Sequence, residues 1–349
     1  MFDPGINSNY RQPRRSKTVR HSRAAKLAIT FLLVGGMVWL FGVRDTLAAD
    51  RVRVALTTKD FGYLPLFVGM RAGIFSDEGL DLQWILVRSN VTTSALIAGE
   101  IDVSASAGSA MRVAARGASL KAILFPYYKC TFVLMGAPDI KTVPDLNGKV
   151  IGNNAPGSTT ELAANMVLES YGLNPKKDVK FFLAGGAETA VIAMQQGLIQ
   201  ARPLNPDAAF VLKKKGFNVL AVLADLGPWP WAGYATSTAK LSQERDKIKR
   251  WTRAMVKSLL YMVNKREETI RIAQNEFGHP RDIVEEALNV SVKAIDRANP
   301  GGATDESLRK NIELTIVEPL NLKETPPLSK LVDFSVLYEA QTELGIRRK

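Results

Sequence analysis

Short alternating segments and longer amphipathic segments follow one another along residues 51–222. Arg51–Thr57 and Leu80–Val87 alternate apolar and polar residues, which predicts β-strands. Gly62–Gly79 lies between them and has the composition of a short helix closed by glycine. Further strands are predicted to begin near Ile101, Leu120 and Cys130, and further helices near Asn90 and Ser109.

The same pattern repeats after Leu146. The predicted order is strand 148–154, helix 158–173, strand 179–185, helix 186–197, strand 198–204, helix 206–216 and strand 217–223. Two such runs, 51–136 and 146–222, predict an α/β fold with parallel sheets that are covered by helices on both faces.

After Ser237 the pattern becomes helical. Residues 241–278 place Trp251, Met255, Leu259 and Met262 three or four positions apart, which predicts one buried helix face. Helical patterns also cover residues 282–298, 305–317 and 332–345. We interpret the apolar stripe as core packing.

The first 49 residues predict a secretory signal. A basic stretch is followed by the uncharged segment Leu27–Val43 and then by the small residues Ala48 and Ala49. An uncleaved membrane anchor is the alternative, because the apolar segment is near the lower length limit for a membrane span. Either way, the rest of the chain is predicted to work outside the cytoplasm, in the periplasm. Arg14-Arg15 weakly suggests a twin-arginine signal.

Composition is that of an ordinary globular protein, with 46% hydrophobic and 23% charged residues in 349. The net charge is +12, but residues 1–49 contain eight basic and two acidic residues, so half of the excess lies in the leader. A nucleic-acid function is therefore not indicated. The single cysteine, Cys130, excludes an intramolecular disulfide and a cysteine-based metal site.

The loops that follow the predicted strands are rich in hydroxyls, amides and glycine. Ligands of open α/β sheets bind at these carboxyl ends. In "VIGNNAPGSTTEL", Gly157 would allow close backbone approach, while Ser158 and Thr159 would either cap the next helix or contact a ligand. Ser158 also stands where a nucleotide-binding P-loop has lysine, so a triphosphate site is not predicted.

Enzymatic devices are scarce. His21 lies in the leader, and His279 adjoins Pro280 at a predicted helix boundary. No Gly-x-Ser-x-Gly elbow and no cluster of metal ligands occurs in the sequence. We therefore predict no catalytic residues, no metal site, no cofactor and no enzymatic activity.

Several phrases resemble the periplasmic solute-binding proteins of ABC importers in the nitrate/sulfonate/taurine class. They are "GYLPLFVGMRAGIFSDEGLDLQWILV", "ALIAGEIDVSASAGSA" and "VPDLNGKVIGNNAPGSTTELAANMVLESYGL", and the likeness extends over nearly all of residues 51–345. The resemblance implies a type II periplasmic-binding-protein fold with two α/β lobes, a hinge and C-terminal helices. Lobe 1 would comprise 51–137 and 235–349, and lobe 2 would comprise 138–234.

The resemblance also implies a non-catalytic function. A monomer would capture a small anionic or polar solute between its lobes and deliver it to an ABC permease in the inner membrane. The residues carried over as ligand-binding are Thr57, Thr58, Phe61, Tyr63, Asn90, Thr92, Ser106, Ser109, Gly157, Ser158, Thr159 and Asn205. The cysteine-rich segment of related pyrimidine-synthase enzymes has no counterpart here.

The residues leave the ligand and the role open. Lys59 and Arg88 could pair with an anion, or could be solvated surface residues. Aromatic residues could instead stack on a pyrimidine-like ring or serve packing; they are Phe61, Tyr63, Tyr127, Tyr128, Trp229 and Trp231. A secreted sensor module is the alternative to a transport protein.

Overall fold

The computed structural model describes residues 49–87 and 89–347. Arg88 and the predicted signal, apart from Ala49, lie outside these ranges. Within the ranges, no helix is long and apolar enough to cross a bilayer.

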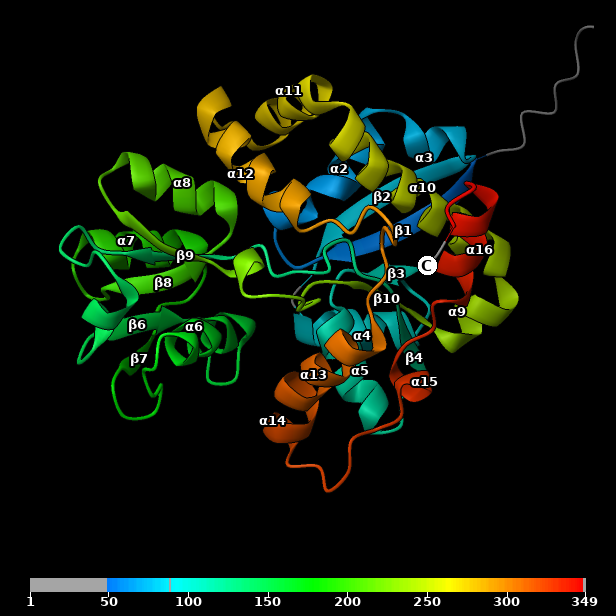
Figure 1. Cartoon of the computed structure of the whole chain (residues 1–349). Helices are drawn as coiled ribbons and strands as arrows, with labels where there is room; N and C mark the ends of the chain where they lie inside the picture. The colour runs from blue at the N-terminus through cyan, green and yellow to red at the C-terminus, as the bar shows by residue number, and fades with distance from the viewer. Residues whose placement is uncertain (1–48, 88, 348–349) are drawn as a thin grey trace, which may run out of the picture. The chain divides into compact units, whose positions relative to one another are not determined.

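The first sheet has five strands in the order β2-β1-β3-β10-β4 (Figure 1). β1 pairs in parallel with β2 and β3, whereas β10 runs antiparallel to β3 and β4. The strand bounds are β1 Asp50–Leu56, β2 Leu80–Leu86, β3 Val103–Ser104, β4 Leu120–Leu124 and β10 Tyr234–Ser237.

The second sheet also has five strands, in the order β7-β6-β8-β5-β9. β6 is parallel to β7 and β8, and β5 is antiparallel to β8 and β9. The strand bounds are β5 Val133–Gly136, β6 Val150–Asn153, β7 Lys180–Leu183, β8 Ala201–Leu204 and β9 Asn218–Val222. β5 thus precedes residue 137, the predicted end of the first part of lobe 1, but pairs within the second sheet.

The α/β fold class is confirmed, but the prediction of purely parallel sheets is wrong. β5 and β10 are the strands through which the chain enters the second sheet and returns to the first. Neither follows a helical crossover within its own sheet, so neither is held to the parallel direction. β10 was not predicted as a strand because all four of its residues are buried and show no alternation.

Two segments cross between the sheets, residues 125–132 and 223–233. They lie against each other, because the Trp229 backbone N–H donates to the Tyr128 carbonyl at 2.9 Å. Lys129 and Pro228 form an antiparallel bridge beside this bond.

Helices cover both sheets, and their order follows the predicted pattern. The helices up to residue 214 are α2 Leu64–Arg71, α3 Ile74–Asp77, α4 Ser89–Ile97, α5 Ala107–Ala115, α6 Thr159–Ser170, α7 Ala187–Gln195 and α8 Pro206–Lys214. Those after residue 237 are α9 Thr238–Gln243, α10 Arg245–Asn264, α11 Arg266–Phe277, α12 Arg281–Lys293, α13 Asp305–Ile312, α14 Glu318–Leu320, α15 Leu328–Leu331 and α16 Ser335–Glu343. Short turns of helix are η1 Phe61–Tyr63, η2 Val143–Leu146, η3 Leu223–Asp225 and the π-helical η4 Glu313–Val317.

The predicted apolar stripe is core, as expected. Trp251, Met255 and Leu259 of α10 are fully buried, and Met262 is nearly so. α10 packs against α2 and α16, which ties the C-terminal helices to the first sheet.

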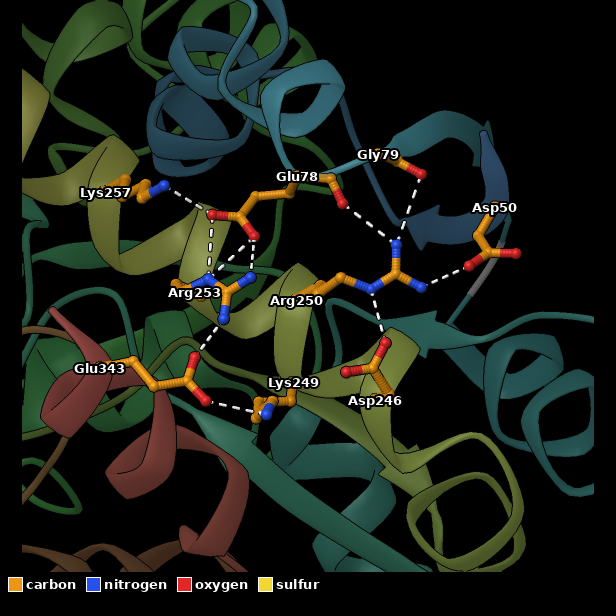
Figure 2. Close-up of polar contacts among 9 residues, drawn as sticks. All are labelled: Asp50, Glu78, Gly79, Asp246, Lys249, Arg250, Arg253, Lys257 and Glu343. Carbon is orange, nitrogen blue, oxygen red and sulfur yellow. Dashed lines mark hydrogen bonds and ion pairs between the residues drawn. The ribbon is translucent and has the colours of Figure 1, made fainter. Parts of the chain in front are cut away.

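Charged residues of α10 hold neighbouring elements together (Figure 2). The Glu78 carboxylate, 3% exposed, accepts hydrogen bonds from Arg253 Nε at 2.8 and 3.0 Å and from Lys257 Nζ at 2.6 Å. Arg250 pairs with Asp50 at the start of β1. Arg253 also pairs with Glu343 of α16. This cluster therefore joins α3, β1 and α16 to one helix.

Candidate functional site

A cavity of about 390 Å³ lies where loops at the carboxyl ends of strands from both sheets meet. Solute pockets typically have a volume of this order. Nine residues predicted as ligand contacts line it: Thr57, Thr58, Tyr63, Ser106, Ser109, Gly157, Ser158, Thr159 and Asn205. The structure therefore brings the polar loops of the two sequence runs to one place.

Three other predicted contacts lie elsewhere or cannot be placed. Phe61 is fully buried, and its ring packs against Phe277 of α11 with centroids 5.5 Å apart. Thr92 is fully buried within α4. Asn90 belongs to α4, but its side chain lies outside the described residues. Among the described residues, neither Phe61 nor Thr92 lines the cavity.

The stretch "GSTTEL" opens α6 at the cavity. Gly157 has φ of 71°, in the left-handed region that favours glycine. Ser158 is the N-cap, and its Oγ accepts from the Glu161 backbone N–H at 3.4 Å. Ser158 Oγ also lies 3.0 Å from Thr160 Oγ1. Ser158 and Thr159 thus face the cavity at a helix N-terminus, so capping and ligand contact are both compatible with their positions.

Arg202 is the most unusual residue of the cavity. It lies in the central strand β8, is 1% exposed, and donates to the backbone carbonyls of Asn153 at 3.4 Å and Gly185 at 2.7 Å. It also donates to the Asn154 side chain, while its Nε has no hydrogen-bond partner. No ion pair of the described residues includes Arg202, and burial lowers the pKa of its guanidinium to about 10.

Arg112 supplies a second guanidinium to the cavity from α5. It is half-buried and donates to Ser109 Oγ at 3.3 Å and to the Thr315 carbonyl, in the π-helical turn η4, at 3.4 Å. Burial lowers its pKa, and within the described ranges it too forms no ion pair with a carboxylate. Two positive groups therefore face one cavity without a counter-ion, which is the arrangement expected of an anion site.

The sequence pattern did not identify these arginines. Arg202 interrupts a fully buried strand, Ala201–Leu204, and that interruption was the available signal. Lys59, which was considered as an anion contact, pairs with Glu276 of α11 at 2.8 Å. Arg88, the other candidate, is outside the described residues.

Aromatic rings form part of the cavity wall. Phe132, Trp229, Trp231 and Tyr63 line it. The rings of Phe132 and Trp231 lie 4.4 Å apart between centroids, and Tyr63 Oη lies 2.9 Å from Thr57 Oγ1. Apolar walls with a few placed polar groups are typical of small-molecule sites.

The residues that could serve as a nucleophile or general base lie away from the cavity. Cys130 is 1% exposed, and burial raises the pKa of its thiol. His279 Nε2 lies 3.4 Å from Asp207 Oδ2, between α11 and α12. Neither lines the cavity, and the described part of the chain holds no group of three metal-ligating side chains.

The two-sheet fold is that of periplasmic binding proteins. The periplasmic aliphatic sulphonate binding protein SsuA from Escherichia coli superposes with a TM-score of 0.66 at 18% identity, covering 82% of this chain and 92% of SsuA. The ligand binding component of an ABC-type import system from Staphylococcus aureus, solved with zinc bound, gives 0.67 at 17% identity, with coverages of 83% and 99%.

The sequence itself also has relatives. The profile described as NMT1/THI5 like matches residues 60–269, more than half of the chain, so the chain belongs to that family. YtlA of Bacillus subtilis (strain 168), which is named as a binding protein, is 23% identical over 278 residues, or 75% of this chain and 82% of YtlA. The family resemblance seen in the sequence is thereby confirmed.

Proposed function

We propose that this protein is the extracytoplasmic solute-binding component of an ABC importer. It would capture a small anion, of the sulfonate, nitrate or carboxylate kind, and deliver it to a permease in the inner membrane. The observation that carries the proposal is the pair Arg112 and Arg202, two guanidinium groups that line one cavity without a carboxylate partner. Similarity to binding proteins of known structure supports it.

The proposed mechanism is closure around the solute. The lobes would be the two sheets with their helices, and the crossing segments 125–132 and 223–233 would form the hinge. The predicted boundaries at residues 137 and 234 lie close to these segments. A solute held by Arg112 from one lobe and Arg202 from the other binds the closed form better and shifts the population toward it. The permease would recognise this form of a periplasmic monomer.

A melting experiment tests the proposal. Sulfonates, nitrate, carboxylates and pyrimidines would each be added to the protein and to the variant Arg112→Met/Arg202→Met. A bound anion at one hundred times its dissociation constant stabilises the folded protein by about 2.7 kcal/mol, so the melting temperature should rise for the protein but not for the variant. Exposed Arg116→Met is the matched control. An unchanged melting temperature throughout would refute solute binding.

One second candidate has a specific observation in its favour. Trp229, Trp231, Phe132 and Tyr63 line the cavity and could stack on a pyrimidine-like ring. Stabilisation by a neutral pyrimidine that persists in the double arginine variant would favour this ligand. A neighbouring kinase or cyclase gene, in place of permease and ATPase genes, would favour a sensor role.

A further inference from the structure

Asp60 gives the cavity a negative group beside its two positive ones. It lies in the loop after β1 and lines the cavity together with Arg112 and Arg202. Its Oδ1 accepts from the Gly62 backbone N–H at 2.9 Å, and its Oδ2 accepts from Thr58 Oγ1 at 2.5 Å. No ion pair in the part of the chain that the structure describes joins Asp60 to a basic residue. The carboxylate thus has hydrogen-bond donors but no counter-charge.

A second carboxylate increases the negative potential around Asp60. Asp207, in the first turn of α8, is 7% exposed and its Oδ1 has no hydrogen-bond partner. Burial and the nearby Asp207 both raise the pKa of Asp60, to about 6. The basic group printed near this pair is His279, whose Nε2 is 3.4 Å from Asp207 Oδ2. The charge of Asp60 is therefore incompletely balanced by the protein.

Aromatic rings lie next to this carboxylate. A Cβ atom on Gly62 would be 3.0 Å from Asp60 Oδ1 and 3.9 Å from the Trp231 ring, so Gly62 separates the two by about one methyl group. Trp231 packs on Phe132, and both rings line the cavity. The faces of aromatic rings attract cations. A carboxylate beside exposed ring surface is a suitable environment for an ammonium group.

We propose that Asp60 and the Trp231 ring form a subsite for a cationic nitrogen, and that the solute is a small zwitterion. Its acid group would bind Arg112 and Arg202, and its ammonium group would bind Asp60. This inference rests on the proposed function, because the arginines must hold the acid group of the same molecule. The solute class is thereby narrowed from small anions to amino acids in the wide sense, amino-sulfonates and aminocarboxylates.

The competing explanation is that Asp60 serves only as the N-cap of η1. The variant Asp60→Asn separates the two roles. Asparagine caps helices about as well as aspartate, so Oδ1 can still accept from Gly62, but the negative charge is lost. Asp77→Asn, at an exposed position outside the cavity, is the matched control.

Titration calorimetry with two probes tests the subsite. 2-Aminoethanesulfonate and ethanesulfonate differ by the amine, and 3-aminopropanoate and propanoate form a second pair. We expect the protein and Asp77→Asn to bind the amine-bearing member about tenfold or more tightly than its partner, and Asp60→Asn to lose this preference. The affinity for the simple acids should change less than about twofold in Asp60→Asn.

The outcomes separate the two proposals. Equal affinity for both members of each pair, or a preference that survives Asp60→Asn, would overturn the zwitterion subsite and leave the anion site intact. Failure of all four probes to bind would overturn both proposals.

Discussion

Replacing Arg202 by methionine should leave the stability of the ligand-free protein nearly unchanged. Burial lowers the pKa of this guanidinium from 12.5 to about 10, which corresponds to a cost of about 3 kcal/mol for keeping it charged in the fold. Against this, Arg202 donates hydrogen bonds to Asn153, Asn154 and Gly185, at roughly 1 kcal/mol each. The two contributions nearly cancel, so the free energy of unfolding should change by less than about 1 kcal/mol.

Urea denaturation of the ligand-free protein at neutral pH measures this free energy. Arg116→Met, at an exposed position, is the control and should change it by no more than about 0.5 kcal/mol. Removing one member of a buried ion pair usually costs about 3–5 kcal/mol. A loss of that size in Arg202→Met would mean that the arginine supports the fold, and would refute our argument that it is held for an anion.

Three further predictions concern other parts of the molecule. Glu78→Gln should lower the free energy of unfolding by about 2 kcal/mol in urea at pH 7, because buried Glu78 would lose its charge-assisted bonds. Burial alone would raise the pKa of Glu78, but its arginine and lysine partners lower it, so its contribution should fade only below pH 4.5; a difference unchanged at pH 3 would contradict this. Because the raised pKa of Asp60 is about 6, calorimetric affinity for 2-aminoethanesulfonate should fall by up to about tenfold per pH unit below that value, and a flat profile would argue against its charge in binding. Ser158→Ala with Thr159→Ala should weaken anion binding while costing about 1 kcal/mol of stability through the lost cap; unchanged affinity would leave these residues as capping residues only.

The secondary structure could largely be predicted, because period and glycine placement act locally. Arg51–Thr57 and Leu80–Val87 became β1 and β2, and the Trp251 stripe became the buried face of α10. β10 and the antiparallel direction of β5 could not be read in the same way. Strand direction depends on where the chain enters a sheet, and a fully buried strand loses the alternation that would reveal it.

The candidate site was predicted in part for the same reason. Hydroxyls and glycines such as Ser106 and Gly157 mark loops at strand ends, and those loops do line the cavity. Arg112 and Arg202 were missed because a basic residue is usually solvated, and only burial without a counter-ion distinguishes these two. That property depends on packing between elements distant in sequence. Lys59 shows the converse, since its partner Glu276 is 217 positions away.

The central claim is that the cavity holds an acid group between Arg112 and Arg202. A crystal structure of the protein with whichever anion stabilises it in the melting experiment tests this claim most directly. We predict density for the acid group with its oxygens about 2.7–3.2 Å from nitrogen atoms of both guanidinium groups. An acid group that contacts neither arginine, or an anion bound outside the cavity, would contradict the account.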